Sequence, residues 1–307
     1  MLQRLRDARR KEEGFTLVEL LIVIVVFGMV MAALLKVVVG QQRFYRGASE
    51  MIETQNNVRD AVAVLRSDLR GLSAAQNDIV AMTATSIDFW EPIGASVVCQ
   101  IGAGATTVVI PPVKLAANNG LTSWVRPPAR NDRVLFYDLG PGRATSDDAW
   151  RQYQLDAAPT SGATCPTVTG FTTTAAEAAT GYTLTLSTAL TQPNIEQGSS
   201  IRFLRQARYS LYQANDGRWY LGYQECPGGT CNTIQPVSGP YLPPSTSGPS
   251  GLTFTYFDST GTVTATPTRV ARIDVVTRSE TRSDLQIPGF GTGPHVDSLS
   301  TSIALRN

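Results

Sequence analysis

The sequence predicts an α+β protein in which one long N-terminal α-helix packs on a β-rich globular head. Three observations support this: an apolar segment long enough to cross a membrane begins at Phe15, an amphipathic pattern continues behind it, and short β-branched runs between turn residues fill the remainder. The chain has 307 residues, of which 42% are hydrophobic and 17% charged. This composition leaves room for a membrane helix and a sizeable core, and it argues against wholesale disorder.

The first 14 residues form a short basic leader that ends at Gly14, with five basic and three acidic residues. Basic residues favour the cytoplasmic side of a membrane, so we expect the chain after the apolar segment to lie outside the cytoplasm. A secretory signal is cut after its apolar core, whereas a cut at the end of this leader, after Gly14, would precede the apolar core. The apolar helix would therefore stay on the mature chain.

The apolar segment covers residues 15–39, which would be about 37 Å long as a helix and enough to cross a bilayer. Glu19 is its only charged residue before Lys36. A carboxylate inside such a helix costs roughly 2.5–3.5 kcal/mol on insertion scales, so it needs a partner. The nearest candidate is the α-amine that a cut after Gly14 would create. The alternative is an interfacial glutamate at head-group depth.

An amphipathic pattern extends the predicted helix to about Gly71, with Gly40 and Gly47 as candidate break points. Apolar residues recur at spacings of four and three, which places them on one stripe that we expect to pack under the head. The stripe consists of Val58, Val62, Leu65, Leu69 and Leu72. A coiled-coil dimer seam is the alternative, although the repeat covers only about two heptads.

Short β-branched runs bounded by turn residues predict the strands of the head. Asn215-Asp216-Gly217 marks a hairpin turn, and two longer loops are expected at Ala157–Gly181 and Pro240–Gly251. The predicted strands are Ser86–Trp90, Val97–Ile101, Thr106–Ile110, Arg133–Leu139, Tyr182–Leu186, Ser200–Leu204, Ala207–Gln213, Arg218–Gln224, Leu252–Phe257, Thr262–Thr266, Val270–Arg278 and Ser298–Asn307.

Four cysteines lie in the predicted head: Cys99, Cys165, Cys226 and Cys231. An even number in an exported domain indicates two disulfides, for which three pairings exist. The run from Cys226 to Cys231 looks like a turn closed by its own bridge, which would leave Cys99 to pair with Cys165. A metal site is the rival interpretation, but two cysteines with four residues between them and no nearby histidine make poor zinc ligands.

No pattern in the sequence indicates catalysis. His295 is the only histidine, so no histidine-based metal cluster can form, and no Gly-x-Ser-x-Gly elbow is present. We expect no catalytic residue, no metal and no cofactor. Without the leader the chain keeps 21 of its 26 basic and 22 of its 25 acidic residues. This near-neutral balance lacks the basic surplus of a sequence-independent nucleic-acid binder.

The stretch Gly14-Phe15-Thr16-Leu17-Val18-Glu19-Leu20-Leu21 resembles the cleavage and methylation signal of type IV prepilins. The C-terminal third is similar to PilW-type minor pilins: a Gly-Leu strand is followed by an aromatic-Asp-x-x-Gly turn, an arginine-bearing strand and a Leu-Arg-Asn ending. The likeness covers roughly the first 72 and the last 55 residues. The J-type minor pseudopilin of type II secretion is close in architecture.

The resemblance implies a leader at 1–14, a pilin helix at 15–72 and an extracytoplasmic head at 73–307. It implies that prepilin peptidase cuts between Gly14 and Phe15, and that Phe15 is N-methylated. Glu19, with Thr16 beside it, would act in assembly by pairing with the terminal amine of a neighbouring subunit. The chain would begin as a single-pass inner-membrane protein and move into a pilus, near its tip.

The expected function is that of a minor pilin that primes or caps pilus assembly, with effects on adhesion, twitching motility or DNA uptake. Its partners would be prepilin peptidase, other minor and major pilins, and the inner membrane. A proline near Lys36 is usual in major pilins and absent here, and the head is bulky; both favour a minor subunit. Two alternatives stay open: a J-type minor pseudopilin, and an enzyme or receptor held by an uncleaved anchor.

Overall fold

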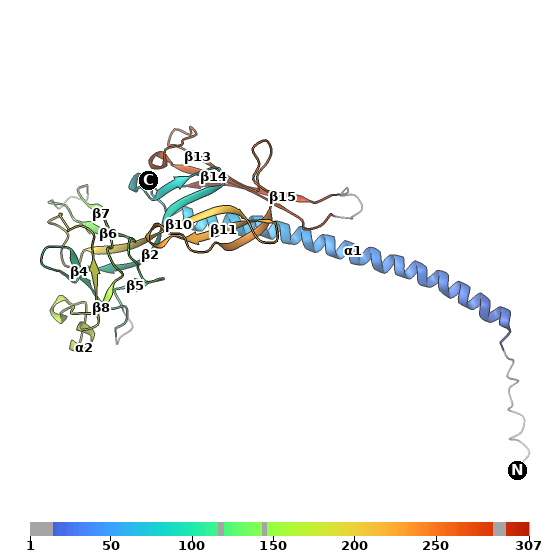
Figure 1. Cartoon of the computed structure of the whole chain (residues 1–307), viewed down its shortest axis with the longest axis horizontal. Coiled ribbons are helices and arrows are strands. Elements are labelled where there is room, and N and C mark those ends of the chain that lie inside the picture. The colour runs from blue at the N-terminus through green and yellow to red at the C-terminus, as the bar shows by residue number, and fades with distance from the viewer. Residues whose placement is uncertain (1–14, 116–119, 143–145, 285–292, 307) are drawn as a thin grey trace, which may run out of the picture. The chain divides into compact units, whose positions relative to one another are not determined.

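The computed structural model describes residues 15–115, 120–142, 146–284 and 293–306 (Figure 1). These residues form two compact units. The first contains the described residues up to Glu53 together with those between Thr281 and His295. The second, which we call the head unit, contains Thr54–Glu280 and the described residues from Val296 onward. The long helix followed by a β-rich head confirms the predicted α+β class.

Helix α1 runs from Leu17 to Leu69 without interruption. Gly28, Gly40 and Gly47 all lie inside it, so neither candidate break point ends or divides the helix. Glycine weakens a helix interior by only about 0.5–1 kcal/mol relative to alanine, which a long helix tolerates. The predicted end near Gly71 is confirmed to within two residues.

The part of α1 that belongs to the head unit buries a stripe of residues: Thr54, Val58, Ala61, Leu65 and Leu69. This differs from the predicted stripe at one position, because Val62 is only half-buried and Ala61 is fully buried. At roughly 100° per residue, Ala61 lies about 40° from Leu65 around the helix and Val62 about 60° on the other side. The inclusion of Val62 was therefore wrong.

The larger sheet of the head unit is antiparallel and has eleven strands among the described residues. Its main path follows the order β1-β2-β10-β11-β12-β14-β13, with β15 on β14, β5 on β2, and β6 and β7 joined to β10. The strands are β1 (Ile79–Met82), β2 (Ser86–Val97), β5 (Ser123–Trp124), β6 (Arg133–Asp138), β7 (Ala149–Gln154), β10 (Ser200–Gln213), β11 (Trp219–Glu225), β12 (Gln235–Tyr241), β13 (Leu252–Phe257), β14 (Arg272–Glu280) and β15 (Val296–Ala304).

The smaller sheet has the order β3-β4-β9-β8. Its strands are β3 (Gln100–Ile101), β4 (Thr107–Ile110), β8 (Thr160–Ala163) and β9 (Gly181–Thr185). The remaining short elements are helix α2 (Ala175–Ala178) and the 3₁₀ turns Ala74–Gln76, Thr167–Thr169, Pro227–Gly229 and Pro267–Arg269.

Two hydrophobic cores stabilise the head unit. The first, the helix-side core, joins the buried stripe of α1 to β2, β10 and β13–β15, including Phe89, Tyr209 and Ile273. The second core lies between parts of both sheets and includes Phe136 and Phe203. The chain's own head covers the apolar stripe of α1 in this core. The stripe is therefore not the seam of a coiled-coil dimer, which was the alternative prediction.

Several strand predictions need correction. Residues 262–266 form no strand; Val263 makes only an isolated bridge to Phe257. The predicted strands Ser200–Leu204 and Ala207–Gln213 are one strand, β10, whose pairing with β2 shifts register at Phe203 and Leu204. The expected loop Ala157–Gly181 contains β8 and α2. The sequence also missed β1, β5, β7 and β12, which are short or interrupted by polar residues.

Candidate functional site: the N-terminal half of α1

The first turn of α1 brings three predicted site residues together. Thr16 precedes the helix as its N-cap, and its Oγ1 accepts a hydrogen bond from the backbone N–H of Glu19 at 3.3 Å. Glu19 thus occupies the third helical position, where an acid is favoured by the positive end of the helix dipole. Phe15 lies directly before the cap and is 79% exposed. Gly14 lies outside the described residues.

The helix behind this turn is apolar on every side and covered by nothing in the described chain. The apolar window that qualifies α1 as a candidate membrane span has no buried residue. Apolar patches of this extent are rare on monomeric soluble proteins and mark contact with a membrane or with other proteins. The exposed side chains are Leu17, Val18, Leu20, Leu21, Ile22, Val23, Ile24, Val25, Val26, Phe27, Met29, Val30, Met31, Leu34, Leu35, Val37, Val38 and Val39.

Glu19 is chemically isolated along this surface. The next acid in the sequence is Glu50, and the intervening charges are Lys36, Arg43 and Arg46. A carboxylate within an apolar surface is costly without a cationic or hydrogen-bonding partner. The first turn therefore supplies one acid and, in a chain cut after Gly14, one amine four residues away.

The acids at the end of the first unit are held by the chain itself. Both carboxylate oxygens of Glu50 accept hydrogen bonds from Ser283, from its N–H at 3.0 Å and its Oγ at 2.8 Å. Arg282 forms an ion pair with Glu53. These contacts tie residues 282–283 to α1 where its apolar surface has ended, so Glu50 and Glu53 have structural roles that Glu19 does not share.

Two buried tyrosines fix the C-terminal part of α1 to the head unit. The Tyr209 hydroxyl donates to Asp68 Oδ2 at 2.5 Å, and the Tyr241 hydroxyl donates to the backbone oxygen of Asn57 at 2.7 Å. Burial, reinforced for Tyr209 by the hydrogen bond to Asp68, raises the pKa of both hydroxyls. These two contacts were not predicted from the sequence, because Asp68 follows the pattern of a solvent-exposed residue beside the apolar stripe.

A buried arginine organises the junction of β6, β10 and β11. The Arg205 guanidinium donates to Asp132 Oδ2 at 2.7 Å, to Glu225 Oε2 at 3.2 Å and to the Pro127 backbone oxygen at 2.8 Å. Buried charges persist when they are paired and hydrogen-bonded, and all three nitrogens of this guanidinium donate hydrogen bonds. Asp132 and Arg205 are far apart in sequence, so no local pattern could have revealed the pair.

The four cysteines form two disulfides, Cys99–Cys165 and Cys226–Cys231. This is the pairing that was predicted from the short separation between Cys226 and Cys231. The first closes 66 residues and the second closes five. No free cysteine remains among the described residues.

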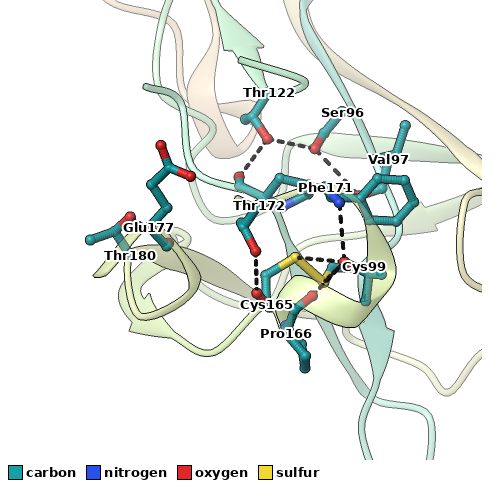
Figure 2. The surroundings of a disulfide bond; sticks show 12 residues. Ser96, Val97, Cys99, Thr122, Cys165, Pro166, Phe171, Thr172, Glu177 and Thr180 are labelled. Carbon is teal, nitrogen blue, oxygen red and sulfur yellow. Dashed lines mark hydrogen bonds between the residues drawn. A yellow bond between two sulfur atoms is a disulfide. The ribbon is translucent and has the colours of Figure 1, made fainter. Parts of the chain in front are cut away.

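Figure 2 shows how the Cys99–Cys165 bridge is embedded. Thr172 Oγ1 donates to the Cys165 backbone oxygen at 2.9 Å, while Thr122 and Ser96 share a hydrogen bond at 2.8 Å nearby. Helix α2 follows, and its N-cap Thr174 accepts from the Glu177 N–H at 3.2 Å in a capping box. The bridge therefore staples the start of the smaller sheet to a hydrogen-bonded loop.

Nothing in the described residues forms a cluster of three or more histidine, cysteine, aspartate or glutamate side chains suited to a metal. His295 is half-buried, and its backbone N–H donates to Thr281 Oγ1 at 2.9 Å. The expectation that the chain has no catalytic residue stays a prediction.

Comparison with protein families matches residues 9–35 to the prokaryotic N-terminal methylation motif. The match contains Gly14, Phe15 and Glu19 and ends inside the apolar half of α1. No curated protein and no solved structure is similar enough to count as a match. The motif and the apolar helix behind it fit a type IV pilin-like or pseudopilin protein, and the motif implies processing by prepilin peptidase.

Proposed function

We propose that this chain is a minor type IV pilin of the PilW type that primes or caps pilus assembly. Prepilin peptidase removes residues 1–14, Phe15 becomes the methylated N-terminus, and the apolar half of α1 passes from the inner membrane into a filament near its tip. The observation that carries this proposal is the exposed apolar N-terminal half of α1, with a single acid, Glu19, in its first turn.

Electrostatics explain why that arrangement suits assembly. Two opposite charges attract strongly where the dielectric constant is low, while each alone is costly. Glu19 and the terminal amine of a neighbouring subunit can therefore set the register between helices that otherwise offer only uniform apolar surface. The family's tip-most subunit tends to lack this acid, so its presence here favours a position with a neighbour on the tip side.

The size of the head supports a minor rather than a major subunit. It contains two hydrophobic cores, fifteen described strands in two sheets and two disulfides. The described helix also runs without interruption, and no proline lies near Lys36. The large head and the uninterrupted helix both suit a subunit made in few copies.

The role of Glu19 is tested by replacing it with the isosteric neutral residue. We expect Glu19→Gln to insert into the membrane normally but to be recovered at least about tenfold less in sheared filaments, since the charge pair is lost. Glu19→Asp keeps the charge and should recover part of the yield. Asp60→Asn, an exposed position on the same helix, is the matched control. Equal recovery of Glu19→Gln and the native chain would contradict the pairing role.

A deletion strain separates the pilus from the secretion alternative. We expect loss of the gene to reduce surface pili while exported enzymes continue to appear in the medium. Normal piliation with a block in protein secretion would instead assign the chain to the J-type minor pseudopilins.

A further inference from the structure

The last strand of the head unit, β15, is paired on one side only. It pairs with β14 in a continuous antiparallel register from Val296↔Glu280 to Ala304↔Arg272, with no bulge. Among the described residues no other strand pairs with its outer side. A strand in this position presents a row of backbone N–H and C=O groups.

The hydrogen-bond pattern identifies which residues face outward. The N–H of Leu305 donates to the backbone oxygen of Ala271, which continues the ladder beyond Ala304. The N–H of Arg278 instead donates to Gly251, toward β13. Since hydrogen-bonded pairs alternate along an antiparallel ladder, odd-numbered residues of β15 bond to β14 and even-numbered residues point away.

Both ends of this outward row are already occupied. The N–H of Ser298 donates to Asp297 Oδ1 at 2.8 Å, and the N–H of Arg306 donates to the Leu72 backbone oxygen at 3.0 Å. Between them, the backbone groups of Ser300, Ser302 and Ala304 have no partner in the described part of the chain, and all three residues are exposed. We call these three residues the open edge.

The outer edge of β13, on the other side of β14, is hydrogen-bonded to other parts of the chain. It differs in this respect from the open edge. On β13, the Phe254 N–H donates to Ala84 and the Tyr256 oxygen accepts from Thr264. Proteins usually protect a free edge with lysine, proline, a bulge or a covering loop. Strand β15 has neither lysine nor proline, and its one charge, Asp297, lies at its start.

We propose that the open edge binds an extended segment of a separate polypeptide, which adds one strand to the sheet beside β15. Alternating donors and acceptors at strand spacing are complementary to another extended backbone. The bound segment would place apolar side chains beside Leu299 and Ile303, which pack at the helix-side core, and small or polar ones beside the exposed serines. This interaction is independent of the proposed role of Glu19.

A peptide copying Arg272–Glu280 is a suitable probe, because it alternates apolar and polar residues and already matches β15 on its other side. We expect the labelled peptide to bind the full chain in detergent saturably, as measured by fluorescence anisotropy. Ser300→Pro combined with Ser302→Pro should weaken binding by about tenfold or more, since two outward donors are removed. Ser298→Pro is the control, because that N–H is already engaged.

Folding of the variants is checked independently. Proline at 300 or 302 removes no bond to β14, so tryptophan fluorescence should report unchanged unfolding, whereas Thr301→Pro should destabilise the head. Residue-resolved hydrogen exchange should show fast amides at Ser300, Ser302 and Ala304 that slow when peptide binds. The proposal is overturned if the peptide does not bind, if it binds the double variant equally well, or if these amides are already protected. Self-association through this edge without peptide binding would replace the proposed occupant with a second copy of the chain.

Discussion

The two halves of α1 have the same backbone and opposite burial. From Leu17 to Val39 the large apolar side chains surround the helix and are all exposed, whereas from Thr54 to Leu69 they form one stripe that is buried in the head unit. The number of apolar residues does not decide this difference; their distribution around the helix does. A stripe fits one folded partner, while an apolar surface on all sides fits lipid or a bundle of other helices.

The largest effect should follow from truncating the buried stripe. Leu65 is fully buried, so Leu65→Ala should lower the free energy of unfolding of the head by about 3 kcal/mol through lost transfer energy and a cavity. Leu21→Ala, at a position 56% exposed, should change it by less than about 0.5 kcal/mol. Denaturant unfolding can be followed by tryptophan fluorescence, because Trp90, Trp124, Trp150 and Trp219 all lie in the head unit. Similar costs for both variants would remove the distinction between the halves.

A smaller effect should separate Ala61 from Val62. Enlarging the fully buried Ala61 to leucine should cost about 1–3 kcal/mol through overpacking. Shortening the half-buried Val62 to alanine should cost less than about 1 kcal/mol. The same unfolding assay applies. A larger cost at Val62 than at Ala61 would support the stripe that was predicted from the sequence, which included Val62.

The smallest effect concerns the anchor between Tyr209 and Asp68, and it depends on pH. Burial raises the pKa of Tyr209, so the folded head holds this proton more tightly than the unfolded chain, in which tyrosine titrates near 10. This contribution to stability is complete below pH 10 and declines as pH rises above it. Tyr209→Phe should cost about 1 kcal/mol at neutral pH and make the alkaline decline shallower, by up to about 1.4 kcal/mol per pH unit. An unchanged slope would show that Tyr209 does not titrate in this range.

The helix was the most predictable element because its signals are local. Apolar length and the spacing of Val58, Leu65 and Leu69 both act within a few turns of one chain segment. The cysteine pairing was also within reach, since a five-residue separation favours a local bridge. The N-terminal candidate site could therefore be located from residues 14–21. Its roles in assembly could not be predicted from residue spacing.

The head was less predictable because its determinants are distant in sequence. Arg205 meets Asp132 across 73 residues, and Tyr209 meets Asp68 across 141. Strand β7 was missed because its alternating pattern is interrupted by polar Arg151 and Gln152 on a partly exposed edge. The opposite error at 262–266 arose because β-branched residues also occur in loops, where sheet pairing is absent.

The most direct test of the account is the intact mass and N-terminal sequence of the chain isolated from cells that contain prepilin peptidase. The account predicts a mature chain that begins at Phe15 and carries one added methyl group on its amine, and a full-length precursor in a strain without the peptidase. A chain that begins at Met1 in both strains would contradict it, because Glu19 would then have no new amine beside it and α1 would be an uncleaved anchor.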